Sequence, residues 1–177
     1  MSRSFLTLCA GLMLAAPAAA QDDDDLPAYD DSLIPACLAA ATNVGRDACI
    51  GITFDPCRGD GPDAVSTVRM VECMGLEITQ WQALLEASYQ QRLVEAEQAD
   101  DLDKSLGKGA TAASVSEAEA LRASQDAWAG YREATCAYIG SRWHGGSGGR
   151  VENSGCYLDL TARRALWMDD MTQEATQ

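Results

Sequence analysis

Cysteine is the residue that most constrains how this chain can fold, because six of its seven cysteines follow a stretch with the marks of an export signal. Arg3 gives a short positive start, residues 5–16 form an apolar run, and small residues lead up to Ala20, as in a secretory signal peptide. The run is shorter than the roughly 20 apolar residues of a transmembrane helix, and the aspartates that follow it disfavour a structural N-terminal helix. We therefore expect cleavage after Ala20 and no membrane anchor in the mature protein. We also expect no lipid anchor, because Cys9 follows Leu8 rather than a small residue.

The six remaining cysteines predict disulfide bonds. An even number of cysteines in an exported chain is typical of disulfides, and buried free thiols are the alternative. Zinc binding and thioredoxin-like redox chemistry are disfavoured, because no Cys-x-x-Cys motif occurs and the chain has a single histidine, His144. Sequence alone leaves many pairings open, and we expect neighbours along the chain to pair. The expected bonds are Cys37–Cys49, Cys57–Cys73 and Cys136–Cys156.

The charge balance excludes several classes of function. The chain has 27 Asp and Glu against 13 Lys and Arg, and loss of a signal peptide with one arginine and no acid lowers the formal net charge from −14 to −15. A nucleic-acid-binding protein needs a basic footprint, and binding to anionic lipid commonly needs a polybasic patch. With a single histidine, the chain cannot form a multi-histidine metal site, and a Ser-His-Asp catalytic triad is disfavoured. We therefore expect that the protein binds no nucleic acid, metal or cofactor and that it has no catalytic residues.

Composition divides the chain into four segments. The stretch from Gln21 to Asp31 is acidic and contains Pro27, which indicates a solvated tail. The Ala-rich stretch from Leu33 to Ile50 suits a short helix pinned by Cys37 and Cys49. The expected segments are a signal peptide at 1–20, a flexible acidic tail at 21–32, a disulfide-tied N-terminal segment at 33–56 and a helical domain at 57–172.

The helical domain is expected to begin with a long helix. Apolar residues recur at steps of three and four, namely at Val71, Met74, Ile78, Trp81 and Leu85. This spacing predicts one apolar stripe on a helix that spans about 65–98. Asp100, Asp101 and two glycines shortly after them predict that the helix ends there in a polar linker.

Two further helices are expected beyond this linker. The second spans about 116–142, and the glycine-rich stretch at 144–150 separates it from a last helix that starts near Cys156 and ends near Thr172. Two candidate capping boxes mark the start of the second helix, Ser114 with Glu117 and Ser116 with Glu119. No strict alternation of apolar and polar residues persists, so little of the chain is expected to form strands.

These patterns predict an all-α fold, a small disulfide-stabilised helical bundle with an N-terminal disulfide-tied extension. Trp81, Trp128 and Trp167 fall one on each long helix, so we expect them in a shared core, and ligand stacking is the alternative. Three pairs of acids are interpreted as solvated helix surface, Glu72 with Glu77, Glu95 with Glu97, and Asp169 with Asp170.

Several short motifs occur in an order that resembles the LprI-type lysozyme-inhibitor family. They are Thr67-x-x-Met70-x-x-Cys73, Trp81-x-x-Leu84-Leu85-x-x-x-Tyr89, Gln125-x-x-Trp128-x-x-Tyr131-Arg132-x-x-x-Cys136, Gly145-Gly146-Ser147 and Cys156-x-x-x-Leu160-Thr161-x-x-Arg164. The resemblance covers roughly residues 57–171 and leaves Cys37 and Cys49 outside. The chain departs from the family pattern at Met168, where leucine is frequent, and at Leu85, where asparagine is usual.

The motif residues are interpreted first as scaffold. Cys136 and Cys156 would clip two helices together across the glycine loop, and Thr161 can cap or back-bond within the last helix. Arg132 and Arg164 are expected to form buried or half-buried ion pairs, because a guanidinium suits bidentate contact with a carboxylate.

The resemblance implies an exported, periplasmic or secreted protein that binds and inhibits lysozyme. Lysozymes are commonly basic, so an acidic partner would be steered towards them. The expected contact residues are Trp143, His144, Ser147 and Arg150 in the loop at 143–150, with a plain turn between helices as the alternative. Two other functions stay open: an envelope protein with a different partner, and a cell-wall glycan hydrolase that uses a pair of carboxylates.

Overall fold

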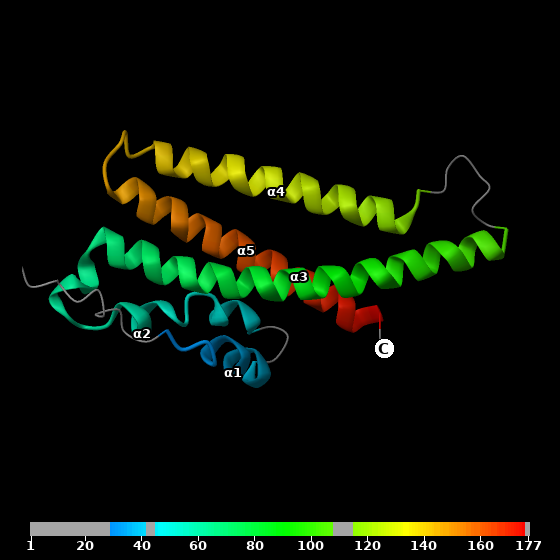
Figure 1. Cartoon of the computed structure of the whole chain (residues 1–177), viewed down its shortest axis with the longest axis horizontal. Coiled ribbons are helices and arrows are strands. Elements are labelled where there is room, and N and C mark those ends of the chain that lie inside the picture. Colours follow the sequence, from blue (N-terminus) through cyan, green and yellow to red (C-terminus); the bar gives the residue numbers. More distant parts are fainter. Residues whose placement is uncertain (1–28, 42–44, 108–114, 176–177) are drawn as a thin grey trace, which may run out of the picture.

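The structure is a computed structural model that describes residues 29–41, 45–107 and 115–175. The expected signal peptide at 1–20 and most of the expected acidic tail lie outside these residues. Every regular element in the described part of the chain is a helix, which confirms the all-α fold (Figure 1). The elements are α1 (Leu33–Ala40), η1 (Arg46–Cys49), α2 (Phe54–Arg58), η2 (Pro62–Val65), α3 (Thr67–Ser105), α4 (Glu117–Ser141) and α5 (Gly148–Ala175), where η denotes a 3₁₀ helix.

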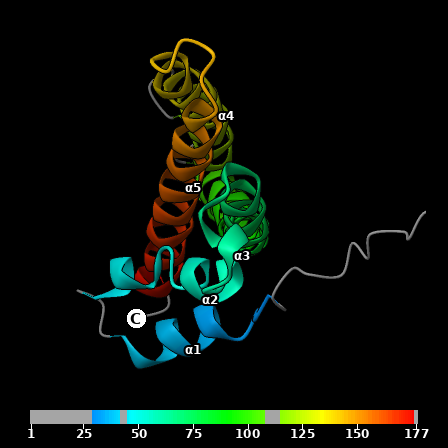
Figure 2. The same ribbon diagram turned by 90° about the vertical axis from the view of Figure 1, so that its left-hand side faces the viewer.

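Helix α5 holds the bundle together. It runs beside α4 over its first turns and then crosses α3, while α1 and α2 lie on the other side of α3 from α4 (Figure 1, Figure 2). The core forms mainly where α3 meets α5, around Trp81, Leu85, Leu158, Ala162 and Met168. None of the described helices is both long enough and apolar enough to span a membrane.

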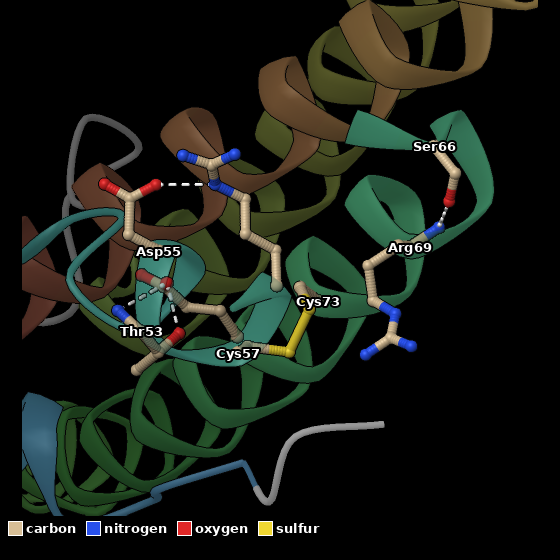
Figure 3. The surroundings of a disulfide bond; sticks show 8 residues. Thr53, Asp55, Cys57, Ser66, Arg69 and Cys73 are labelled. Carbon is tan, nitrogen blue, oxygen red and sulfur yellow. Dashed lines mark hydrogen bonds and ion pairs between the residues drawn. A yellow bond between two sulfur atoms is a disulfide. The ribbon is translucent and has the colours of Figure 1, made fainter. Parts of the chain in front are cut away.

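The three disulfides join the cysteines in the expected neighbour pairs. Cys37–Cys49 ties α1 to η1, and Cys57–Cys73 ties α2 to the first turns of α3 (Figure 3). Near the second bond, the hydroxyl of Ser66 caps α3 by accepting a hydrogen bond from the backbone N–H of Arg69 at 3.1 Å. The N-terminal extension is therefore covalently closed on itself and covalently bound to the bundle.

Glu77 is fully buried, although the sequence placed it among the surface acids. Its carboxylate accepts hydrogen bonds from the backbone N–H of Gly51 at 2.6 Å, from the N–H and hydroxyl of Thr53, and from the indole N–H of Trp81 at 3.0 Å. A buried carboxylate is tolerated only when its oxygens are satisfied in this way. Glu77 therefore fastens the irregular segment between η1 and α2 onto α3.

The N-terminal extension differs in detail from the expected short helix. Helix α1 ends at Ala40, and the second cysteine of this segment lies in the separate turn η1. Arg46 of η1 pairs with Asp169 and Asp170 of α5, so these two acids are partners of a buried arginine rather than free surface charges. Ion pairing and burial of Ile34 in the core explain why the segment packs on the bundle.

Helix α3 is longer than the sequence predicted, because it continues through Asp100 and Asp101 to Ser105. Gly107, with φ of +69°, follows its end in a conformation that favours glycine. Asp100 lies inside α3, and its carboxylate contacts the start of α4. There it accepts hydrogen bonds from Ser116 Oγ and from the backbone N–H of Glu117. We predicted from the sequence that the helix ends at these aspartates, and this role of Asp100 was missed.

Candidate binding surface on the α4–α5 hairpin

The turn between α4 and α5 forms the apex of a helical hairpin. Helix α4 ends at Ser141, close to the predicted boundary, but α5 begins at Gly148, well before the expected start near Cys156 (Figure 1). The glycines that were interpreted as a helix break are partly inside the last helix. The reason is close packing, because an added Cβ at Gly149 would lie 2.8 Å from the carbonyl oxygen of Gly140.

Trp143 covers the beginning of α5 from the turn. A Cβ at Gly148 would lie 2.4 Å from Cζ3 of the Trp143 ring, so only glycine leaves room for this ring. The chain reverses at His144 and Gly145, whose φ angles of +48° and +87° lie in the left-handed region. Even so, 49% of Trp143 remains exposed, which leaves part of the ring available to a partner.

Two interactions join α4 to α5 close to the apex. The Cys136–Cys156 disulfide joins α4 to α5, and the side-chain amide of Asn153 donates a hydrogen bond of 2.9 Å to the carbonyl oxygen of Cys136. The apex is therefore a short turn on a cross-linked pair of helices, and this geometry limits the conformational freedom that binding would have to remove.

The four residues proposed from the sequence all lie at this apex, but on two sides of it. Ser147 and Arg150 line a hollow of about 570 Å³ together with the glycines of the turn. Trp143 lines a separate hollow of about 300 Å³ with Arg142 and Glu152. The structure thus brings Arg142, which the sequence analysis did not single out, next to the expected contact residues.

A second group of side chains follows the contact between α4 and α5, and we call it the seam: Trp128 and Arg132 of α4, with Tyr157, Arg164 and Trp167 of α5. The guanidinium carbon of Arg132 lies 4.7 Å from the Trp128 ring centroid and 5.3 Å from that of Tyr157. The guanidinium carbon of Arg164 lies 4.2 Å from the Trp167 centroid and 5.6 Å from that of Trp128. Both cations therefore stack on aromatic rings, and they share Trp128.

The seam corrects two expectations. Among the described residues, neither Arg132 nor Arg164 has a carboxylate within ion-pair distance, and both donate hydrogen bonds to neutral side chains. Arg132 donates to Thr161, and Arg164 donates to Gln125 and Ser124, each at 3.0 Å. Of the three tryptophans expected in the core, Trp81 is fully buried, and Trp128 is partly buried and packs against the core while also contacting both arginines. Trp167 is exposed, and its ring packs against Arg164.

Burial also affects the electrostatics of the seam. Desolvation lowers the pKa of Arg164 from its ordinary value, although a guanidinium stays charged at neutral pH. Tyr157 donates its hydroxyl to Glu133, and this hydrogen bond is the main reason that the pKa of Tyr157 is raised. Glu133 is therefore engaged by the tyrosine rather than by either arginine.

Unpaired cations gather on the hairpin. In the described part of the chain, Arg132, Arg142, Arg150 and Arg164 take part in no ion pair. The arginines that pair with a carboxylate are Arg46, Arg58 and Arg92 outside the hairpin, Arg122 on α4 and Arg163 on α5. The exposed aromatic residues Tyr131, Tyr138, Trp143 and Trp167 lie on the same two helices and their turn. Arginine, tyrosine and tryptophan are the residues that most often carry binding energy in protein interfaces.

The described residues form no cluster of three or more histidine, cysteine, aspartate or glutamate side chains that could hold a metal ion. The hairpin offers cationic donors and aromatic rings, and these groups are suited to recognition of a partner.

Comparison with known proteins agrees with the motif pattern. A family model described as "Lysozyme inhibitor LprI" matches residues 57–168, which is more than half of the chain. The chain belongs to the LprI lysozyme-inhibitor family. It is also 37% identical over 73 residues to an uncharacterized protein of Rhizobium meliloti (strain 1021); the match covers 41% of this chain and about half, 52%, of that protein. No solved structure matches the chain.

The LprI match includes α4, the turn and α5 as far as Met168, and therefore all four unpaired arginines. It begins at Cys57, so it contains the Cys57–Cys73 and Cys136–Cys156 bonds, the apex and the seam. It leaves out α1 and η1 with the Cys37–Cys49 bond. The extension is thus an addition to the LprI part of the chain that packs on α3 and α5.

Proposed function

We propose that this LprI-family protein is an exported binding protein that binds lysozyme and inhibits it, with the apex of the α4–α5 hairpin as its inhibitory element. The observation that carries the proposal is the concentration of unpaired arginines and exposed aromatic rings on that hairpin, in a chain with twice as many acids as bases. The three disulfides and the expected signal peptide support a periplasmic or secreted location.

The apex has the chemistry to meet a lysozyme active site. Glycoside hydrolases of this type carry two carboxylates beside the scissile bond, in a cleft that opens to solvent. Arg142, His144 and Arg150 place nitrogen donors at the tip of a narrow hairpin, and the exposed part of Trp143 adds an aromatic surface. The glycines let the backbone approach a partner closely. Insertion of this tip would pair the cleft carboxylates with cations and block the substrate.

The rest of the molecule supplies the opposite charge. From Glu86 to Asp126 the sequence has nine acidic residues against four basic ones, whereas residues 127–158 contain three arginines and two glutamates. A basic lysozyme would be attracted at long range by the acidic body, and its acidic cleft would then meet the cationic apex. Long-range attraction of this kind raises the association rate and weakens as salt screens it.

The first experiment measures inhibition of cell-wall lysis by the mature, oxidised protein over a series of salt concentrations, with several lysozymes. We expect inhibition that weakens as salt rises. Absence of both binding and inhibition with every lysozyme would reject the proposal and point to another envelope partner. Release of soluble glycan fragments by the protein alone would instead identify a hydrolase.

Two pairs of variants then test the apex. Arg150→Gln removes an unpaired apical charge, and Arg122→Gln removes an equal charge that pairs with Glu97 away from the apex. We expect the first to weaken inhibition by about tenfold and the second by less than about twofold. Gly148→Ala should displace the Trp143 ring and weaken inhibition, whereas Gly130→Ala on α4, where an added Cβ meets nothing within 4 Å, should not. Equal effects within either pair would contradict the role of the apex.

A further inference from the structure

We propose that the seam is a second binding site, separate from the apex, that takes a pair of carboxylates presented by an acidic segment of a partner protein. This proposal does not depend on lysozyme being the partner. It starts from a mismatch in a strongly acidic protein: two guanidinium groups share one tryptophan ring, and no carboxylate of the described residues lies within ion-pair distance of either group.

The mismatch is specific to the seam. Arg163 and Arg164 are neighbours on α5, yet Arg163 pairs with Asp159 and Asp47. Within the described part of the chain, the partners of Arg164 are Gln125, Ser124 and aromatic rings. Two like charges near one ring repel each other, and a bound anion would relieve this repulsion. The repulsion therefore favours binding of a dianion at the seam. Arg163 is already paired with carboxylates, so the same argument does not apply to it.

The two guanidinium groups also have donors to offer. The Nη1 of Arg132 donates to Thr161 and its Nε is buried, so Nη2 is the nitrogen of this side chain that a ligand can reach. Arg164 uses Nε and Nη2 on its neutral partners, which leaves Nη1 for a ligand. Stacking on Trp128 fixes both planar groups in advance, so a carboxylate would bind without ordering two long side chains.

The same geometry argues for a protein rather than a sugar as the occupant. The guanidinium groups stack over the Trp128 and Trp167 rings, which sugars would otherwise use as stacking platforms. Trp167, whose ring lies under Arg164, is 43% exposed, so an aromatic surface also borders the site. A group of arginines fixed between aromatic rings is the usual composition of a protein-binding hot spot.

The four tryptophans of this chain provide the test. Trp128 and Trp167 report on the seam, Trp143 on the apex, and Trp81 on the core, where its indole N–H donates to Glu77. The mature, oxidised protein is titrated with the peptide Ac-Glu-Glu-NH2 at near-physiological salt, and the indole ¹H–¹⁵N signals are followed by NMR. We expect saturable shifts of Trp128 and Trp167, an unmoved Trp81 signal, and no saturable shift with Ac-Gln-Gln-NH2.

Matched variants separate the seam from general charge. Arg164→Gln should weaken binding of Ac-Glu-Glu-NH2 by about tenfold, and Arg163→Gln, which removes the same charge one residue away, by less than about twofold. If Arg164→Gln disturbs the Trp81 signal and hence the fold, Trp167→Leu is the second variant and should weaken binding severalfold. The proposal is overturned by an unresponsive seam, by equal shifts with the glutamine peptide, or by equal losses in the Arg163 and Arg164 variants.

Discussion

At the scale of single residues, Glu77 shows most clearly how a side chain can hold two parts of this molecule together. It lies on the long helix α3, but its carboxylate receives donors from Gly51 and Thr53, which precede α2. In sequence it is one more acid among 27, and no local pattern distinguishes it from Glu72 on the same helix. Only the path of the N-terminal segment over α3 makes it a buried acceptor.

This role predicts the effect of Glu77→Gln. In glutamine an NH2 group, which is a donor, replaces one of the two carboxylate oxygens that accept hydrogen bonds. At least one buried N–H or O–H would therefore lose its partner. We expect a loss of about 1–3 kcal/mol in the free energy of unfolding, measured by urea denaturation. Glu72→Gln is the control, since Glu72 is exposed, and it should change stability little. Equal stability of the two variants would show that the Glu77 contacts are not needed.

At the scale of elements, the contact between the end of α3 and the start of α4 depends on Asp100. Its carboxylate accepts hydrogen bonds from the hydroxyl of Ser116, the N-cap residue of α4, and from the backbone N–H groups of Glu117 and Ala118. Ser116 in turn caps α4 by accepting from the N–H of Glu119, so the second of the two candidate capping residues is the one used. One helix thus supplies an N-terminal cap to the next.

These hydrogen bonds, first of all the one from Ser116, lower the pKa of Asp100 in the folded protein. A lowered folded-state pKa stabilises the fold above the ordinary carboxyl pKa of about 4, and this stabilisation is lost as the pH falls through the lowered value. Asp100→Asn should therefore lower the melting temperature at neutral pH and have a smaller effect in strong acid. Thermal melts over a pH series measure this difference.

Asp101→Asn is the matched control for the cap, because Asp101 is exposed and pairs with Lys104 on its own helix. It should alter the melting temperature little at any pH, since an exposed ion pair contributes little to stability. A loss for Asp101→Asn as large as that for Asp100→Asn would assign the effect to general charge rather than to the cap.

The sequence predicted which segments are helical, but it did not always predict where the helices begin and end. The apolar steps through Met74, Trp81 and Leu85 gave α3 and its buried face correctly. The errors fall at Asp100, where a side chain caps another helix, and at Gly148 and Gly149, where close packing requires glycine inside α5. In each case a partner distant in space, which no local pattern reveals, decides where the helix ends.

At the scale of the whole molecule, the N-terminal extension and the LprI part of the chain share one core. Ile34 of α1 is fully buried in that core, and Arg46 of η1 is buried against Asp169 and Asp170 of α5. The division expected at residues 56 and 57 therefore marks where the family match begins, whereas the packing continues across it.

The shared core predicts the effect of removing the Cys37–Cys49 bond. The double variant Cys37→Ser and Cys49→Ser should lose about 2–4 kcal/mol of stability and still unfold in one transition, because the extension and the bundle lose their packing together. Urea unfolding followed both by far-UV circular dichroism and by fluorescence dominated by tryptophan measures this. Two separate transitions would mean that the extension is an independent unit.

The sequence by itself determined the all-α class and the family, because apolar periodicity and ordered motifs are local properties of the chain. It left the cysteine pairing open, and the structure contains the three neighbour pairs that we expected. The sequence also predicted that Trp143, His144 and Ser147 lie in the turn between two helices, whereas Arg150, predicted in the same loop, lies in the first turn of α5. Only the tertiary structure decided which charges have partners. Arg132 and Arg164 were expected to form ion pairs and instead stack on rings, because whether an arginine meets a carboxylate depends on which helix faces it.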